Sequence, residues 1–200
     1  MKKIITIGRQ FGSGGREVGQ KIAQALHIAY YDKELLAVAA KKSGLSSQFM
    51  NTYDEKPTRS FLYSLVMGQR GLFSDSAEAT VEQLAANAQR DAILAVAGEG
   101  SCVIVGRCAD HILRNEQGLL RVFLTADHGD RIQRICRRDS VTTAEAEEKL
   151  QRMDRSRAAY YRFRCDQTWG AAANYDLCIN VSRWVVDAAV ETIVERCGRA

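Results

Sequence analysis

The chain has 200 residues, of which 46% are hydrophobic and 26% are charged, and its formal net charge is +4. This balance and the single proline are typical of one globular domain and exclude a largely disordered chain. The mild basic excess suits an anionic small molecule as well as nucleic acid. The six cysteines form no C-x-x-C pair, so we expect no metal site built from protein ligands. No signal peptide or membrane-length apolar run is recognisable, and we expect a cytoplasmic protein.

The first predicted element is a buried strand at residues 3–7, which runs into a glycine-rich loop that opens a helix. Glycines let backbone N–H groups point at an anion, and a helix N-terminus adds partial positive charge. We therefore predict a phosphate-binding loop that holds a nucleotide; the alternative is a glycine-rich turn that binds nothing. The predicted binding residues are Gly12, Ser13, Gly14, Gly15, Arg16 and Glu17.

This loop departs from the usual phosphate-loop pattern, in which a lysine and then a Ser or Thr follow the second glycine. Gly15 stands at the lysine position. No Ser or Thr follows to bind magnesium, because the next residues are Arg16 and Glu17. We predict that Arg16 supplies the phosphate charge as a planar fork. Replacing Arg16 should then weaken phosphate binding more than replacing Arg9.

Strand-like and helix-like stretches alternate along the rest of the chain. Strands are expected at residues 28–31, 101–105, 120–124 and 175–180, and helices at 77–97, 127–138, from 143 onward and at 185–197. This alternation predicts an α/β fold with a parallel central sheet of about five strands flanked by helices. The irregular stretch 41–76 is the best candidate for an insert.

Several charged residues fall where such a fold binds its ligands, at the carboxyl ends of the strands. Asp32 and Arg107 each follow a predicted strand. Asp32 either contacts substrate or caps the next helix, whereas Arg107 is expected to be functional. Arg131 and Arg134, three apart, share one helix face and either contact phosphate or face solvent.

The order of these motifs resembles the cytidylate kinase-like family of P-loop nucleoside monophosphate kinases. The matching segments are residues 4–19, 25–32, 106–107, 122–126, 154–158 and 174–180. The resemblance covers nearly the whole chain and implies a three-layer P-loop kinase fold. In that fold residues 1–200 form a single domain, with 33–76 as an acceptor-binding insert and about 126–165 as a lid.

The resemblance implies an ATP-dependent kinase that moves the γ-phosphate of ATP to a nucleoside monophosphate, CMP or dCMP first, with ATP and Mg²⁺ as cofactors. It also implies a lid role for Arg157 and a substrate contact for Asp154. With these, the predicted catalytic residues are Arg16, Arg131 and Arg157, and the predicted substrate-binding residues are Asp32, Arg107 and Asp154. Arg155 and Arg157 are two apart on a helix, so at most one should reach the ligand. Small nucleotides are the expected partners, rather than nucleic acid or membrane.

Four positions depart from the cytidylate kinase pattern: Gly15 replaces lysine, Val38 replaces the acceptor-phosphate arginine, and Val105 and Cys108 replace the two aspartates around Gly106-Arg107. The candidates to replace that arginine are Lys33, Arg59 and Arg70. Three alternatives stay open: a kinase for another small molecule, a nucleotide-binding regulator without catalysis, and an RNA-binding module. The last is disfavoured because aromatic residues are not interleaved with the basic ones as a stacking platform requires.

Overall fold

A computed structural model describes residues 2–32 and 75–198 of the chain. In this part, five parallel strands form one sheet in the order β2-β3-β1-β4-β5. The strands are β1 (Ile4–Arg9), β2 (Ala29–Tyr31), β3 (Cys102–Val105), β4 (Leu119–Thr125) and β5 (Leu177–Asn180). The predicted α/β fold with a parallel sheet is therefore confirmed.

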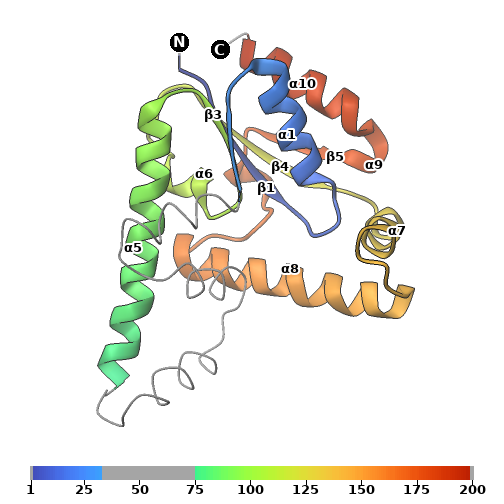
Figure 1. The fold of residues 1–200 in the computed structure, drawn as a ribbon, viewed down its shortest axis with the longest axis horizontal. Helices are drawn as coiled ribbons and strands as arrows, with labels where there is room; N and C mark the ends of the chain where they lie inside the picture. Colours follow the sequence, from blue (N-terminus) through green and yellow to red (C-terminus); the bar gives the residue numbers. More distant parts are fainter. Residues whose placement is uncertain (1, 33–74, 199–200) are drawn as a thin grey trace.

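Helices cover both faces of this sheet (Figure 1). The helices are α1 (Gly15–Leu26), α5 (Asp75–Glu99), α6 (Ala109–Ile112), α7 (His128–Asp139), α8 (Thr143–Cys165), α9 (Val181–Trp184) and α10 (Val186–Gly198), with a 3₁₀ turn at Ala172–Asn174. In the described residues, no helix has the length and apolarity that a membrane crossing requires.

Alternation along β1 separates the two layers of the core, because successive strand side chains point to opposite faces. Ile5 and Ile7 pack with Val18 of α1 and Ile193 of α10. Ile4 faces the other way and belongs to the cluster that contains α5 and α6 residues. Residues 4–7 and 102–105 are buried without a break, as central parallel strands require.

Helices α7 and α8 extend beyond the carboxyl edge of the sheet, where the loop after β1 lies (Figure 1). Phe11 of that loop packs in one cluster with Ile135 of α7 and Leu150 of α8. Helix α8 begins with a capping box, in which the Thr142 hydroxyl accepts from the Glu145 N–H and Glu145 accepts from the Thr142 N–H. The predicted lid region, residues 126–165, thus consists mainly of two helices packed on the loop. The predicted insert, 33–76, lies almost wholly outside the described residues, as do Lys33, Val38, Arg59 and Arg70.

Candidate active site

The glycine-rich loop joins β1 to α1 in the geometry that phosphate binding requires. Gly12 and Gly14 have φ angles of 78° and 84°, a left-handed region that glycine enters at little cost. Gly14 is the N-cap of α1, and among the described residues no side-chain cap bond closes the first turn of this helix. Backbone N–H groups at this helix end are therefore available to an anion.

Ser13 closes this loop from within. Its side chain is fully buried, and its Oγ donates to the Gln10 carbonyl at 2.9 Å. The Ser13 N–H also donates to that carbonyl, at 3.3 Å. Ser13 is one of the predicted binding residues, and in the structure its hydroxyl is bonded within the loop itself.

A large open cavity of about 1050 Å³ lies over the loop, between α1 and the α7–α8 pair. Its described walls include the loop, Asp32 and Arg107. Its basic wall residues are Arg9, Arg16, Arg107, Arg134, Arg137, Arg138, Lys149 and Arg157, and its acidic ones are Glu17, Asp32 and Asp139. A cavity with this excess of cations suits a polyanionic ligand.

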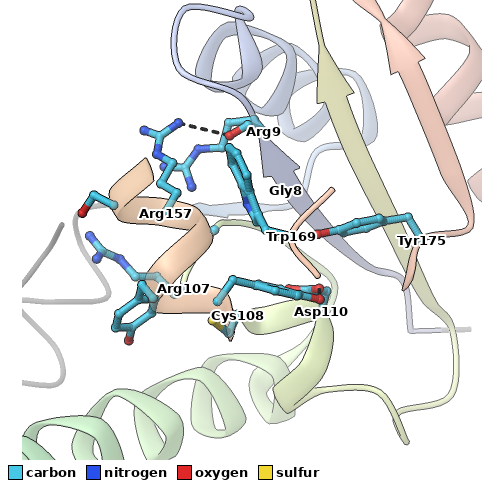
Figure 2. Close-up of a pocket in the computed structure, with 12 residues that line it drawn as sticks. Gly8, Arg9, Arg107, Cys108, Asp110, Arg157, Trp169 and Tyr175 are labelled. Atoms are coloured by element: carbon cyan, nitrogen blue, oxygen red, sulfur yellow. Dashed lines mark hydrogen bonds between the residues drawn. The ribbon is translucent and has the colours of Figure 1, made fainter. Parts of the chain in front are cut away.

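A second, small cavity of about 50 Å³ adjoins the first at the carboxyl ends of β1 and β3 (Figure 2). Arg9, Arg107 and Arg157 lie along one side of it, and Asp110, Trp169 and Tyr175 lie along the other. In the described residues, these three arginines are the side chains common to the walls of both cavities.

Arg107 is held in this position by an unusual backbone. Gly106, Arg107 and Cys108 have consecutive φ angles of 78°, 63° and 55°. A left-handed conformation costs a non-glycine residue about 1–2 kcal/mol, and such strain tends to mark functional sites. Burial, with a smaller contribution from the charge of Arg157, lowers the pKa of Arg107 to about 10. The strand end therefore presents a half-buried cation at the junction of the two cavities.

Arg16 and Asp32 form a pair at the edge of the large cavity. Arg16 Nε and Nη2 each lie 2.8 Å from Asp32 Oδ2, and Asp32 is only 5% exposed. Arg9 Nη2 lies 3.8 Å from the other oxygen of this carboxylate. The sequence predicts Arg16 as the phosphate cation, whereas in the structure its guanidinium lies on the aspartate that ends β2.

Arg131 and Asp154 brace the loop from behind, and neither is among the described residues that line the cavities. Arg131 is 5% exposed, and its Nε donates to the Phe11 carbonyl at 2.8 Å. Asp154 Oδ1 accepts from the Phe11 N–H at 2.8 Å, and Oδ2 accepts from Arg131 Nη2. The sequence predicts Arg131 as a catalytic residue and Asp154 as a substrate contact; in the structure the contacts of both fix the backbone of the loop at Phe11.

Two further arginines donate to carbonyls of the loop segment. Arg134 Nη1 donates to the Gly12 carbonyl at 2.7 Å, and Arg157 Nη1 donates to the Arg9 carbonyl at 3.1 Å. Arg155 instead donates to Gln151 of its own helix and is absent from the described cavity walls. Of Arg155 and Arg157, the structure thus brings only Arg157 to the described cavity walls.

The fit of Mg²⁺ to these residues follows from the chemistry of its ligands. In the described residues, no three His, Cys, Asp or Glu side chains gather into a metal cage. In phosphotransfer sites, however, one or two carboxylates, the substrate phosphates and water commonly hold Mg²⁺. Asp32 and Asp139 on the cavity wall face arginines, whereas Glu17 lies in the first turn of α1, 51% exposed, with Lys21 at 3.5 Å. Among the described carboxylates of this wall, Glu17 is therefore the one that fits this ion.

The sheet order, the strand–loop–helix and the basic cavity define a P-loop kinase fold. An uncharacterized protein from Eubacterium ventriosum is similar over 100% of both chains, at 29% identity and a TM-score of 0.76. Shikimate kinase from Bacteroides thetaiotaomicron shares the fold at 16% identity and a TM-score of 0.55, covering 99% of both chains. Shikimate kinase from Acinetobacter baumannii also shares the fold, at 13% identity and a TM-score of 0.53. The match covers 100% of this chain and 94% of that one.

The family is narrower than the fold. Residues 4–183 match the cytidylate kinase-like family, and the chain belongs to it. A cytidylate kinase from Methanopyrus kandleri is 23% identical over 212 residues, covering 96% of this chain and 95% of that protein. The family resemblance expected from the sequence is thus confirmed, and the chain is a nucleotide kinase by family.

Proposed function

We propose that this protein transfers the γ-phosphoryl group of ATP to a nucleoside monophosphate, with CMP or dCMP as the first acceptor to test. The observation that carries the proposal is the position of the glycine loop. It leads from β1 into an uncapped helix N-terminus and lines an arginine-rich cavity, in a chain of the cytidylate kinase-like family.

In this proposal residues 12–17 hold the phosphates of ATP, mainly through backbone N–H groups. Mg²⁺, when bound, would neutralise charge between the β- and γ-phosphates, and Glu17 would hold it. Arg107 and Arg157 face the phosphoryl group in transfer from the junction of the cavities. Phosphoryl transfer depends on positioning and positive charge, and one arginine can contribute about 10³–10⁵ in rate.

The rest of the chain supports the reaction indirectly. We assign Arg131 and Asp154 to positioning of the loop, and residues 126–165 to a lid, because α7 and α8 pack against Phe11. We assign acceptor binding to residues 33–76, of which 33–74 lie outside the described part of the chain. All six cysteines are free thiols, which supports a reducing, cytoplasmic location.

A kinase for a different small acceptor is the second candidate, and Cys108 favours it. At position 108 the cytidylate kinase pattern has an aspartate. In this chain Cys108 is 7% exposed and packs with Cys165 and Tyr161. A hydrogen bond with Cys165, together with burial, raises the pKa of the Cys108 thiol, so it stays neutral. A neutral thiol is a much weaker hydrogen-bond acceptor than a carboxylate, so Cys108 would not reproduce the contacts of that aspartate.

The deciding experiment is an acceptor screen with γ-labelled ATP and Mg²⁺ across nucleosides, nucleoside monophosphates and small alcohols. Label transfer to CMP or dCMP supports the first candidate, and transfer only to another molecule supports the second. ATP binding without ADP release contradicts both and indicates a regulator. Retention on RNA that weakens steeply with salt and ignores nucleotide would support the RNA-binding alternative.

Arg157 provides a matched test within this screen. We expect Arg157→Ala to lower kcat by at least about tenfold with little change in ATP affinity, because a transition-state contact affects kcat first. Arg155→Ala, two residues away and bonded to Gln151, should keep wild-type kcat. Equal kcat in the two variants would remove Arg157 from the reaction.

A further inference from the structure

The cation that the loop lacks at position 15 has a structural substitute. A Cβ atom at Gly15 would lie 2.7 Å from Arg9 Cβ and 2.8 Å from Arg9 Cγ. Real Cβ atoms do not approach other atoms so closely, so a side chain at position 15 and the observed Arg9 side chain exclude each other. Gly15 is thus required where phosphate loops usually have lysine, because Arg9 passes across it.

The far end of Arg9 reaches the neighbouring strand. A Cβ at Gly106 would collide with Arg9 Nη1 and lie 3.0 Å from Cζ, and Gly106 also has a φ of +78°. The guanidinium therefore lies against Gly106, the residue that follows β3. Strand β3 is the direct neighbour of β1 in the sheet. Glycine at both 15 and 106 leaves room for this one side chain.

The surroundings of Arg9 carry an excess of positive charge. Arg9 lines both cavities together with Arg107 and Arg157, and Arg157 donates to the Arg9 carbonyl. The Arg9 side chain is 19% exposed, and the carboxylate of Asp32, 3.8 Å from it, also holds Arg16 at 2.8 Å. Among the described residues, one buried carboxylate thus faces two arginines, and the basic side chains that line this junction outnumber the acidic ones.

We propose that Arg9 is a catalytic residue that replaces the phosphate-loop lysine, and that its guanidinium contacts the phosphoryl group in transfer. This inference rests on the proposed kinase function. An acceptor oxygen forms a bond to the γ-phosphorus, and the bond from that phosphorus to the bridging oxygen breaks. The bonding pair leaves with ADP, and any acceptor proton passes to solvent. Arg9 forms no covalent bond in this step; it offsets negative charge on the phosphoryl oxygens.

This assignment reverses the order expected from the sequence for Arg9 and Arg16. Arg16 lies at the helix start but is 56% exposed and bonded to Asp32, whereas Arg9 lies where the two cavities join. Arg9→Ala should therefore reduce turnover and polyphosphate binding more than Arg16→Ala does.

The first test compares Arg9→Ala and Arg9→Lys with Arg114→Ala, a surface arginine bonded to the His111 carbonyl. ADP release is measured with the best acceptor of the screen, or with water. We expect Arg9→Ala to lower kcat at least about tenfold, Arg9→Lys to recover part of the loss, and Arg114→Ala to match wild type. A smaller loss in Arg9→Ala, or no recovery by lysine, would overturn the inference.

The second test restores the usual arrangement. Gly15→Lys alone should be poorly active because the introduced side chain and Arg9 compete for one space. Arg9→Gly also removes the Arg9 Cβ, which would lie 2.7 Å from a Cβ at position 15, so Arg9→Gly combined with Gly15→Lys should exceed Arg9→Gly in kcat at least about tenfold. A double variant no better than Arg9→Gly, or a Gly15→Lys variant as active as wild type, contradicts the exchange. Thermal melting verifies the fold of each variant, and Arg9→Lys keeps the inference testable if Arg9→Ala does not fold.

A third measurement separates this inference from the proposed function. Inorganic tripolyphosphate, without Mg²⁺, is titrated calorimetrically into wild type and Arg9→Ala. We expect at least about a fivefold weaker affinity in the variant, and equal affinity would overturn the role of Arg9. A wild type that binds tripolyphosphate through Arg9 but never releases ADP would instead overturn the kinase function alone.

Discussion

Val185 holds the least favourable backbone conformation among the described non-glycine residues. Its φ is 53° and its ψ is 165°, in a region that is essentially restricted to glycine, and its side chain is β-branched. Val185 joins α9 to α10 and is 62% exposed, so its side chain gains little from burial. The next residue, Val186, lines the large cavity.

We therefore expect Val185→Gly to stabilise the protein by about 1 kcal/mol. Relief of strain of about 1–3 kcal/mol exceeds the entropy that an added glycine costs, about 0.5–1 kcal/mol. Urea unfolding measures the change, and Val185→Ala is the control because alanine keeps a Cβ and hence the strain. A glycine variant less stable than the alanine variant would contradict the strain.

Asp110 is a buried carboxyl group at the wall of the small cavity. It is 6% exposed and accepts a hydrogen bond from the Tyr161 hydroxyl at 2.6 Å. Burial raises its pKa, against smaller opposing effects of its hydrogen bonds. A raised pKa in the folded state gives stability that is complete below the unfolded value of about 3.9 and is lost as pH rises through the folded pKa.

Asp110→Asn should therefore become more stable relative to wild type as pH rises from about 4 to 7, because asparagine keeps an acceptor for Tyr161 without ionising. Urea unfolding at each pH measures this difference. The same comparison in a Tyr161→Phe background tests whether the hydroxyl moderates the effect. If the wild type instead became more stable relative to Asp110→Asn as pH rises, the fold would favour the charged carboxylate.

At the scale of elements, Asp139 ties the end of α7 to α8. Arg138 Nε lies 2.6 Å from Asp139 Oδ1, and Lys149 of α8 pairs with Oδ2. The hydrogen bond from Arg138 is the largest cause that lowers the pKa of Asp139, and the one from Lys149 adds to it. A lowered folded pKa gives stability that is present above about 3.9 and is lost as pH falls through the folded pKa.

We expect Asp139→Asn to be less stable than wild type at pH 7, with a difference that shrinks as pH falls below about 4. A double-mutant cycle with Lys149→Met isolates the link between the helices, expected at about 0.2–1 kcal/mol for a partly exposed pair. Chemical unfolding of the four proteins gives this coupling. Additive effects would show that the pair does not hold α7 to α8.

How far the sequence predicts this site depends on how local each contact is. The strand, the glycine loop and the helix start lie within residues 4–26, so glycine spacing and hydrophobic pattern were sufficient. Asp154 meets Phe11 across 143 positions, and no spacing rule relates them. Arg16 was predicted as the phosphate cation because it opens the helix, but its direction depends on Asp32 at the end of β2. The role proposed for Arg9 is not predictable from the sequence, because the path of this side chain across Gly15 follows from the folded loop.

On the scale of the whole molecule, charge is distributed unevenly. The described wall of the large cavity carries eight basic and three acidic side chains, a net of +5. The whole chain has a net charge of +4, so all other residues together carry −1. The positive potential is therefore concentrated at the cavity, where low-dielectric walls focus it on an incoming anion.

This distribution predicts that the affinity for anionic ligands, but not for uncharged ones, depends strongly on salt. Raising NaCl from about 50 mM to about 500 mM shortens the screening length about threefold, and we expect the Kd of tripolyphosphate to rise at least about tenfold. Adenosine, which is uncharged, should show little change. Arg137→Ala, on the cavity wall, should flatten the salt dependence, whereas Arg114→Ala should leave it unchanged. Equal slopes in these two variants would mean that net charge, and not the cavity, attracts the ligand.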